Sequence, residues 1–201
     1  MVKSFYVETL GCPKNQVDSE KLIGTLLADG MQPTDDPTRA DLVVVNTCAF
    51  IDEARRESID TILALEDQRK HGAKLVVTGC MAERYGHELA EAMPEVDQVA
   101  GFGVPVNLTM KPAGRRSIAV DAVSVPSLDL LNLPRPKATA PWAYVKIAEG
   151  CDRNCGVCAI PSFRGPQRSR SIDSILAEVD ELEAREIVLV AQDLAAFGRD
   201  Q

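Results

Sequence analysis

Three cysteines lie close together in the stretch EGCDRNCGVCAIP, where Cys151, Cys155 and Cys158 have the spacing C-x3-C-x2-C. Thiolates at this spacing can wrap one metal centre, and soft sulfur donors suit zinc or iron–sulfur clusters. A structural zinc site closes with four protein ligands, and a ferredoxin cluster is held by four cysteines. No fourth cysteine and no histidine follows here. The set therefore fits a [4Fe–4S] cluster with one iron left open, to which the amine and carboxylate of S-adenosylmethionine can bind.

The other three cysteines each follow an apolar, β-branched run. Cys12 comes after SFYVETL, Cys48 after DLVVVNT and Cys80 after KLVVTG. If these runs are neighbouring parallel strands, all three cysteines lie at the carboxyl edge of the sheet, where α/β folds bind ligands. A single free cysteine is more often a core residue than a ligand. Three at matching positions instead favour a shared site.

The pattern around these runs predicts an α/β fold. Amphipathic helical patterns over 16–30 and 51–72 alternate with the strands, as in a parallel sheet with right-handed crossovers. The stretch VDQVAGFGV suggests a further short strand and helix. Prolines crowd 122–141, which is predicted to be a linker. After it come a strand over 142–150, a loop with the second cysteine set, a helix over 171–186 and a strand over 187–193.

The composition is that of an ordinary globular protein, with 201 residues, 45% hydrophobic and 26% charged. The net charge of −8 argues against stable nucleic-acid binding. No apolar run approaches the roughly 20 residues that cross a bilayer, and the N-terminus lacks the features of a secretory signal. The expected location is the cytoplasm, where six cysteines are better explained as metal ligands than as disulfides.

Several motifs match known families. The spacing C-x3-C-x2-C after a first barrel strand resembles the radical S-adenosylmethionine superfamily. LGCPKNQVDSE, VNTCAFIDEA and VTGC resemble the N-terminal domain of the methylthiotransferases. Within that family, LGCPKN, NTC-x-FI and IPS-x-RG resemble the branch that modifies an aspartate of the twelfth small-subunit ribosomal protein. The tRNA-modifying branch more usually has GCQMN and VPYTRG at these places.

The resemblance implies a domain plan. Residues 1–121 would form a parallel-sheet methylthiotransferase domain with an auxiliary cluster. Residues 122–141 would be the linker, and 142–201 the start of a radical S-adenosylmethionine (βα) partial barrel. The family's barrel continues further, so the chain is expected to be a truncated form with doubtful catalysis.

The resemblance also implies the cofactors and the chemistry. Cys151, Cys155 and Cys158 would hold one [4Fe–4S] cluster, and Cys12, Cys48 and Cys80 a second. A radical formed from S-adenosylmethionine would abstract hydrogen from the aspartate β-carbon, and the second cluster would present the sulfur. Val157 stands where many members carry an aromatic residue beside the adenine. The partners would be the ribosomal protein and an electron donor such as flavodoxin or ferredoxin.

Other interpretations stay open. The tRNA adenosine methylthiotransferases are the nearest alternative, followed by a non-catalytic fragment that binds zinc or an iron–sulfur cluster. A basic stretch formed by Arg153, Arg164, Arg168 and Arg170 is either a solvated loop or a carboxylate-binding element, with Arg164 and Arg168 as candidates for the cofactor's carboxylate. Residues 18–20 are interpreted as acidic and polar residues that open a helix.

Overall fold

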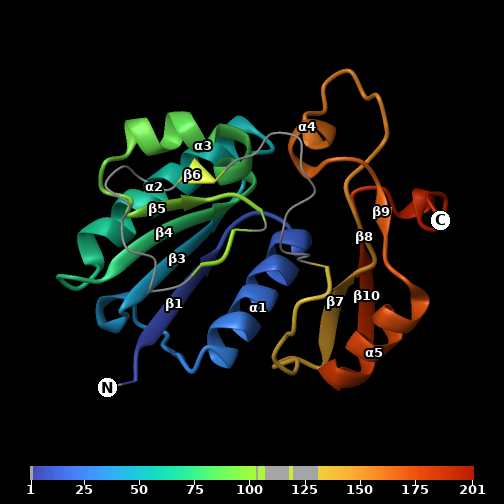
Figure 1. Ribbon diagram of the computed structural model, residues 1–201, viewed down its shortest axis with the longest axis horizontal. Helices are drawn as coiled ribbons and strands as arrows, with labels where there is room; N and C mark the ends of the chain where they lie inside the picture. The colour runs from blue at the N-terminus through green and yellow to red at the C-terminus, as the bar shows by residue number, and fades with distance from the viewer. Residues whose placement is uncertain (1, 103, 107–117, 120–130) are drawn as a thin grey trace.

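The structure, a computed structural model, describes residues 2–102, 104–106, 118–119 and 131–201. Its larger sheet contains six parallel strands within these ranges (Figure 1). The strands predicted for SFYVETL, DLVVVNT and KLVVTG are confirmed. Residues 42–47 are fully buried and 74–79 largely buried, as a parallel sheet covered on both faces requires, whereas 4–9 are mostly half-buried. The strands are β1 (Ser4–Thr9), β2 (Gln32–Pro33), β3 (Leu42–Thr47), β4 (Lys74–Gly79), β5 (Gln98–Ala100) and β6 (Ile118–Ala119).

Three helices cover the two faces of this sheet. Helix α1 (Pro13–Ala28) packs its Leu26 on one face, against Phe5, Val44 and Val76. Helices α2 (Asp52–Gln68) and α3 (Cys80–Ala92) pack on the other face, over Val45 and Val77 among others. A short 3-10 turn, Pro37–Arg39, precedes β3. The predicted α/β class is therefore confirmed for this part of the chain.

Helix α1 begins earlier than the pattern over 16–30 predicted. Pro13 occupies its first turn, where a missing N–H costs nothing, and Cys12 is the N-cap residue. Residues 18–20 consequently lie inside the helix, and its first turn holds no acidic residue. The interpretation of 18–20 as a helix-opening group is wrong. Of the strand and helix suggested by VDQVAGFGV, the structure shows β5, and 101–102 and 104–106 form no helix.

The strand order is β2-β1-β3-β4-β5-β6. The chain moves outward in one direction from β1 to β2, and in the opposite direction from β3 to β6. The order therefore reverses between β1 and β3, and in open α/β sheets ligands bind at such a point, outside the carboxyl ends of the strands.

The second part of the chain is a βαβ unit. Strand β7 (Trp142–Lys146) pairs in parallel with β10 (Glu186–Val190), and α5 (Ile172–Leu182) packs on them through Leu182. The single strand predicted over 142–150 is instead split, because β8 (Ala148–Glu149) turns away to pair antiparallel with β9 (Arg168–Ser169). A short helix, α4 (Ile160–Arg164), follows the second cysteine set, and a 3-10 turn, Leu194–Ala196, follows β10.

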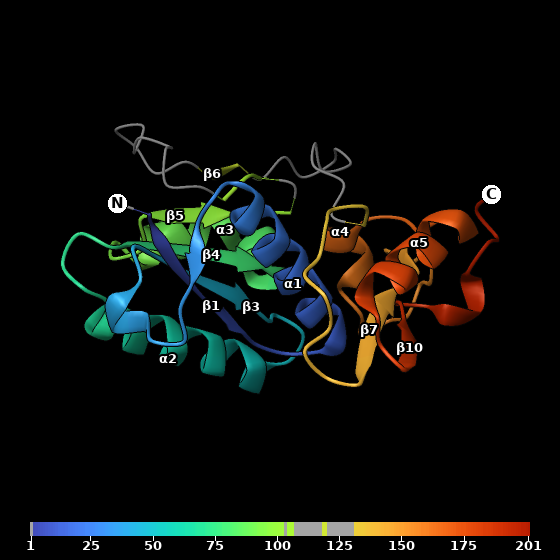
Figure 2. The same cartoon turned by 90° about the horizontal axis from the view of Figure 1, so that it is seen from below.

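Helix α1 lies between the larger sheet and the βαβ unit, with β7 along its outer side (Figures 1 and 2). Residues 131–135, within the predicted linker, run across this junction. Lys21 of α1 is buried there and donates to the carbonyl of Leu131 and, at 3.1 Å, to Glu178 of α5. Arg135 donates at 2.6 Å to the same carboxylate. Residues 122–130 lie outside the described residues, so the domain boundaries stay a prediction.

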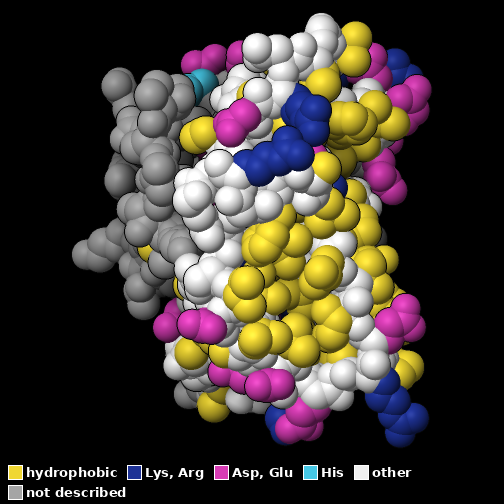
Figure 3. Space-filling model, turned by 90° about the vertical axis from the view of Figure 1, so that its right-hand side faces the viewer, with side chains coloured by type: hydrophobic (Ala, Val, Ile, Leu, Met, Phe, Trp, Pro, Cys, Tyr) yellow, Lys and Arg dark blue, Asp and Glu magenta, His cyan; other side chains and the backbone are white. Residues whose placement is uncertain are grey.

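One face of the βαβ unit is rich in apolar side chains (Figure 3). Its exposed large side chains include Ile172 and Leu176 on α5, Leu189 on β10, and Leu194. Strand β10 pairs with β7 on one side alone within the described ranges. None of the helices in those ranges is both long and apolar enough to span a membrane.

Candidate functional site

The first cysteine set lies at the carboxyl edge of the larger sheet. Cys12 follows β1 as the N-cap of α1, Cys48 follows β3 directly, and Cys80 follows β4 as the first residue of α3. Strands β1, β3 and β4 are consecutive in the sheet. The topology therefore brings three residues that are far apart in sequence to one edge, beside the reversal of strand order. Cys48 and Cys80 are buried, and Cys12 is half-buried.

Two glycines let the chain turn tightly beside these cysteines. Gly11 has a φ of +93°, and a β-carbon there would lie 2.8 Å from Cβ and 3.0 Å from Sγ of Cys48. Gly79 has a φ of +91°, and a β-carbon there would lie 2.6 Å from the carbonyl oxygen of Thr47. Both positions combine a left-handed backbone with a contact that leaves no room for a side chain. The glycines of LGC and TGC thus hold the three strand ends close together.

Asn15 ties the edge together from α1. Its buried side chain donates from Nδ2 to the carbonyls of Leu10 (2.9 Å) and Thr47 (3.0 Å), at the ends of β1 and β3. Its Oδ1 lies 3.5 Å from Sγ of Cys80, after β4. One amide therefore contacts all three strand ends that carry the cysteines.

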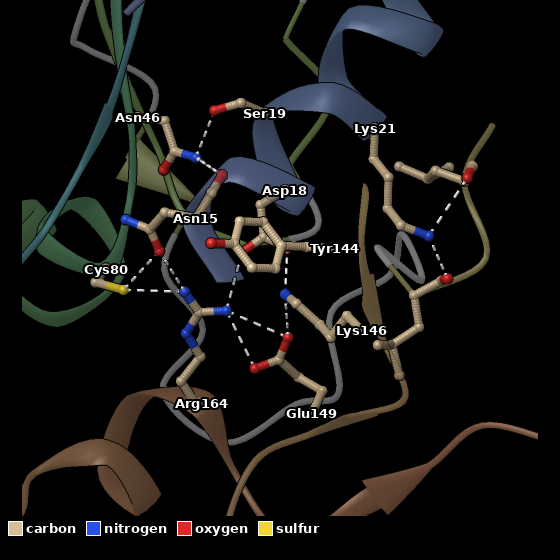
Figure 4. Close-up of polar contacts among 12 residues, drawn as sticks. Asn15, Asp18, Ser19, Lys21, Asn46, Cys80, Tyr144, Lys146, Glu149 and Arg164 are labelled. Atoms are coloured by element: carbon tan, nitrogen blue, oxygen red, sulfur yellow. Dashed lines mark hydrogen bonds and ion pairs between the residues drawn. The ribbon is translucent and has the colours of Figure 1, made fainter. Parts of the chain in front are cut away.

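A buried ionic cluster joins this edge to the βαβ unit (Figure 4). Arg164, at the end of α4, donates from Nη1 to Asp18 of α1 (3.0 Å) and to Glu149 of β8 (3.1 Å). Lys146 of β7 pairs with the same two carboxylates, at 2.8 Å from Glu149. Two cations thus face two anions. The side chains of all four residues are at least nine-tenths buried.

Arg164 also reaches the first cysteine set. Its Nη2 donates to Oδ1 of Asn15 and to Sγ of Cys80, each at 3.0 Å, and its guanidinium lies 4.2 Å from the ring centroid of Phe102. A residue that follows the second cysteine set by six positions therefore contacts a cysteine of the first set.

Two pKa values at this cluster are shifted in opposite directions. Burial opposes ionisation of Glu149, but the charges of Arg164 and Lys146 outweigh it and lower the pKa of Glu149 to about 2. Burial raises the pKa of the Cys80 thiol, although the nearby guanidinium of Arg164 works against it. The carboxylate is therefore charged at neutral pH, and its charge is matched inside the protein.

The second cysteine set lies on the loop between β8 and α4. Cys151 is buried, with its N–H bonded to the carbonyl of Gly165 at 3.1 Å. Cys155 is exposed and Cys158 half-buried, and the N–H of Cys158 bonds to the carbonyl of Cys155 at 3.1 Å. Cys151 is thus the most buried and Cys155 the most exposed cysteine of this set.

The predicted cofactor contacts occupy different surroundings. Val157 is fully exposed, in the loop between Cys155 and Cys158. Arg168 is half-buried in β9, and Arg164 is buried in the ionic cluster. Arg170 is buried too, where it donates to Glu178. The basic stretch is therefore not simply a solvated loop, since two of its arginines form buried ion pairs.

The donor chemistry of both sets fits an iron–sulfur cluster, since each offers three thiols and thiolates are the usual protein ligands of such clusters. In the first set, Gly11 has no side chain that would collide with Cys48, and the guanidinium of Arg164 donates a hydrogen bond to the sulfur of Cys80. Across the described ranges no three cysteine, histidine or acidic side chains are arranged to enclose a metal ion. The assignment of the six cysteines as ligands stays a prediction.

A small cavity lies beside the edge, between α1 and the ends of β3 and β4. Its volume of about 40 Å³ is enough for one or two water molecules. Residues that line it include Asp18, Asn46, Thr78 and Phe102.

The sequence interpretation missed the ionic cluster. Asp18 was assigned to a helix start, and Lys146 and Glu149 were assigned no role. One signal was available. Lys146 and Glu149 interrupt the apolar stretch WAYVKIAEG, and charged side chains in a buried strand need partners of opposite charge.

Comparison with known proteins identifies relatives over the whole chain. A family model described as "Uncharacterized protein family UPF0004" matches residues 4–101, which span β1 to β5. The ribosomal protein uS12 methylthiotransferase RimO of Anaeromyxobacter sp. (strain K) is 44% identical, covering 100% of this chain and 44% of the relative. The protein of the same name from Myxococcus xanthus (strain DK1622) is 46% identical, covering 98% of this chain and 43% of the relative.

A solved structure is also similar, that of the cobalamin-dependent S-adenosylmethionine radical enzyme OxsB. It is 12% identical, with a TM-score of 0.47, and the match covers 96% of this chain and 34% of that one. This likeness is too remote to indicate a ligand. The chain spans less than half the length of the curated relatives it matches. Over 98–100% of its length, the chain is therefore similar to a part of these RimO proteins.

Proposed function

We propose that the chain belongs to a radical S-adenosylmethionine methylthiotransferase that adds a methylthio group to the β-carbon of an aspartate in ribosomal protein uS12. The observation that carries this proposal is the identity of 44–46% to RimO proteins over 98–100% of the chain. The relatives are more than twice as long, so catalysis is proposed for the whole enzyme of this type.

The proposed cofactors are two [4Fe–4S] clusters and S-adenosylmethionine. Cys151, Cys155 and Cys158 would hold one cluster, and Cys12, Cys48 and Cys80 the other. When bound, these groups would supply a substrate radical and the sulfur that is inserted. Val157, Arg164 and Arg168 were the candidate contacts of S-adenosylmethionine. We keep Val157, which is exposed, and Arg168, which is half-buried, as proposed contacts. Arg164 is less suited to this role, because it is buried and its guanidinium already donates to Asp18, Glu149 and Cys80.

The residues of the chain would keep the two sites at a fixed separation. Asp18 lies on α1, of which Cys12 is the N-cap residue, and Glu149 lies two residues before Cys151. Lys146 and Arg164 pair with both carboxylates. Because this network is buried and neutral overall, it resists sliding of one unit against the other.

Iron and sulfide analysis tests the cofactors. After anaerobic reconstitution, about eight irons per chain are expected for two such clusters, with matching sulfide. Replacing Cys12, Cys48 and Cys80 with alanine should halve the iron, as should replacing Cys151, Cys155 and Cys158. Zinc without sulfide would contradict both sites and favour the zinc-binding alternative.

Mass spectrometry tests the substrate. In a strain that lacks the gene, uS12 should lose a methylthio group from one aspartate, and the gene should restore it. Loss of methylthio groups from tRNA adenosines, with uS12 unchanged, would favour the tRNA-modifying branch instead. An electron donor such as flavodoxin or ferredoxin is proposed as a further partner and would be needed in any reconstituted assay.

A further inference from the structure

The contact between Arg164 and Cys80 joins the two cysteine sets. Arg164 stands six residues after Cys158, whereas its Nη2 lies 3.0 Å from the sulfur of Cys80, 84 residues earlier in the chain. Figure 4 shows the guanidinium between the Cys80 sulfur and the carboxylates of Asp18 and Glu149. A side chain from the part of the chain that carries the second cysteine set therefore contacts the first set.

The guanidinium is held firmly in this orientation. Phe102 lies against it, with 4.2 Å to the ring centroid, and Asn15 accepts from the same Nη2 at 3.0 Å. Asn15 is itself fixed by its two bonds to strand-end carbonyls. The planar guanidinium of arginine can donate to carboxylates from Nη1 and to the Asn15 amide oxygen and the Cys80 sulfur from Nη2. The single ammonium group of a lysine cannot reach both sets of partners in this way.

The charge of Arg164 is balanced without the sulfur. Asp18 and Glu149 offset Lys146 and Arg164, so the ion pairs do not depend on a charge at Cys80. The Nη2 donor is therefore directed to the sulfur as an additional interaction. Hydrogen bonds to cluster sulfurs and nearby charge are two of the factors that set a cluster's reduction potential.

We infer that Arg164 is a positioning residue of the first cysteine set, which donates a hydrogen bond to the sulfur of Cys80 and tunes the cluster that this set would hold. This inference rests on the proposed cluster at Cys12, Cys48 and Cys80. It adds a specific role for one arginine, which the sequence had suggested only as a contact of S-adenosylmethionine.

Arg170 is a matched control. It is also a buried arginine of the same segment, and it donates to the carboxylate of Glu178 at 2.5 Å and to the carbonyl of Lys146 at 3.0 Å. Among the described residues, its hydrogen bonds go to Lys146, Glu178 and Ser174, not to a cysteine. Arg170→Lys therefore loses a buried guanidinium fork without changing the environment of the first set.

The test uses the full chain with Cys151, Cys155 and Cys158 replaced by alanine, so that only the first set can bind a cluster. Iron is counted after reconstitution, and the midpoint potential is measured by redox titration followed by electron paramagnetic resonance. Arg164→Met should shift the potential to a more negative value, because a cation and a donor near the sulfur are lost. Arg164→Lys should shift it in the same direction by less, and Arg170→Lys should leave it unchanged.

The outcomes are distinguishable. If the parent binds a cluster and all three variants share its potential, the inference is overturned while the proposed site stands. Equal shifts in Arg164→Lys and Arg170→Lys would also overturn it, because a general loss of packing would then explain the change. If the parent binds no iron, the proposed site itself is wrong, and the inference falls with it. Arg164→Lys keeps the charge, so it remains informative if Arg164→Met does not fold.

Discussion

Gly11 packs directly against the side chain of Cys48, across the point where the strand order reverses. A β-carbon at position 11 would lie 2.8 Å from Cβ of Cys48. Gly11→Ala is therefore expected to displace Cys48 and to lower the iron bound by the first cysteine set. Iron and sulfide analysis after reconstitution measures this.

Gly72→Ala is the matched control for this prediction. Gly72 has a φ of +83°, close to the +93° of Gly11, but a β-carbon there would meet nothing within 4 Å. Both variants should lose about 1 kcal/mol through the left-handed backbone. Only Gly11→Ala should also lose iron, and equal iron content in the two variants would contradict the role given to the glycine.

Glu149 should make the folded protein less stable at acidic pH. Its pKa is lowered to about 2 in the folded protein from an ordinary value of 4.5, through the charges of Arg164 and Lys146. The folded state therefore gains stability above pH 4.5 that is lost as the pH falls from 4.5 toward 2. A shift of this size corresponds to about 3 kcal/mol at neutral pH.

Glu149→Gln tests this contribution. At pH 7 the variant should unfold at a lower urea concentration than the parent, because two buried cations lose a counter-charge. The difference should shrink as the pH is lowered from 4.5 to 3. Glu88→Gln, on the exposed face of α3, should show no such pH-dependent difference. If the urea concentrations at which Glu149→Gln and the parent unfold differ by the same amount from pH 7 to pH 3, the Glu149 carboxylate does not contribute through its ionisation.

Sequence patterns sufficed where local order decides the structure. Apolar runs define β1, β3 and β4, and the parallel arrangement that they predict places Cys12, Cys48 and Cys80 at one edge of the sheet. The contact of Arg164 with Cys80 was not predictable in this way, since it depends on how two units pack rather than on either segment. The split between β7 and β8 was missed because a two-residue strand carries no periodicity.

The ion-pair partners of the buried charged residues could also not be predicted from the sequence. Lys146 and Glu149 are only three positions apart, and the sequence allows either side chain to face solvent. The pairing of Lys146 with Asp18 follows from the packing of α1 against β7, which no motif records. The helix start at Pro13, by contrast, follows a local rule and was available in the sequence.

Gly24 should be required for residues 131–135 to pack on α1. Its α-carbon lies against the chain there, so that a β-carbon would come 2.8 Å from the carbonyl carbon of Pro134 and 3.2 Å from Cα of Arg135. Glycine to alanine inside a helix normally stabilises it by about 1 kcal/mol. Gly24→Ala is expected to do the opposite and to expose 131–135 to proteolysis, because backbone cannot move aside as a side chain can.

Limited proteolysis with mass spectrometry measures this effect, together with thermal unfolding. Gly156→Ala is the control, since a β-carbon there meets nothing within 4 Å. It should leave both the cleavage pattern and the melting temperature close to those of the parent. A Gly24→Ala variant that melts higher than the parent would show that the junction does not need this close approach.

The exposed edge of β10 should promote self-association of the 201-residue chain. Leu189 is 48% exposed on this strand, which pairs only with β7 in the described part of the chain, and Leu176 is exposed on α5 nearby. An apolar edge strand is a template for pairing with another chain, and a charge on it blocks that pairing. Leu189→Lys should therefore lower the average mass that light scattering measures at high concentration. Leu63→Lys, at a similarly exposed leucine on α2, removes an apolar side chain without charging a strand edge. An equal effect of the two substitutions would mean that general surface apolarity, and not the edge of β10, drives the association.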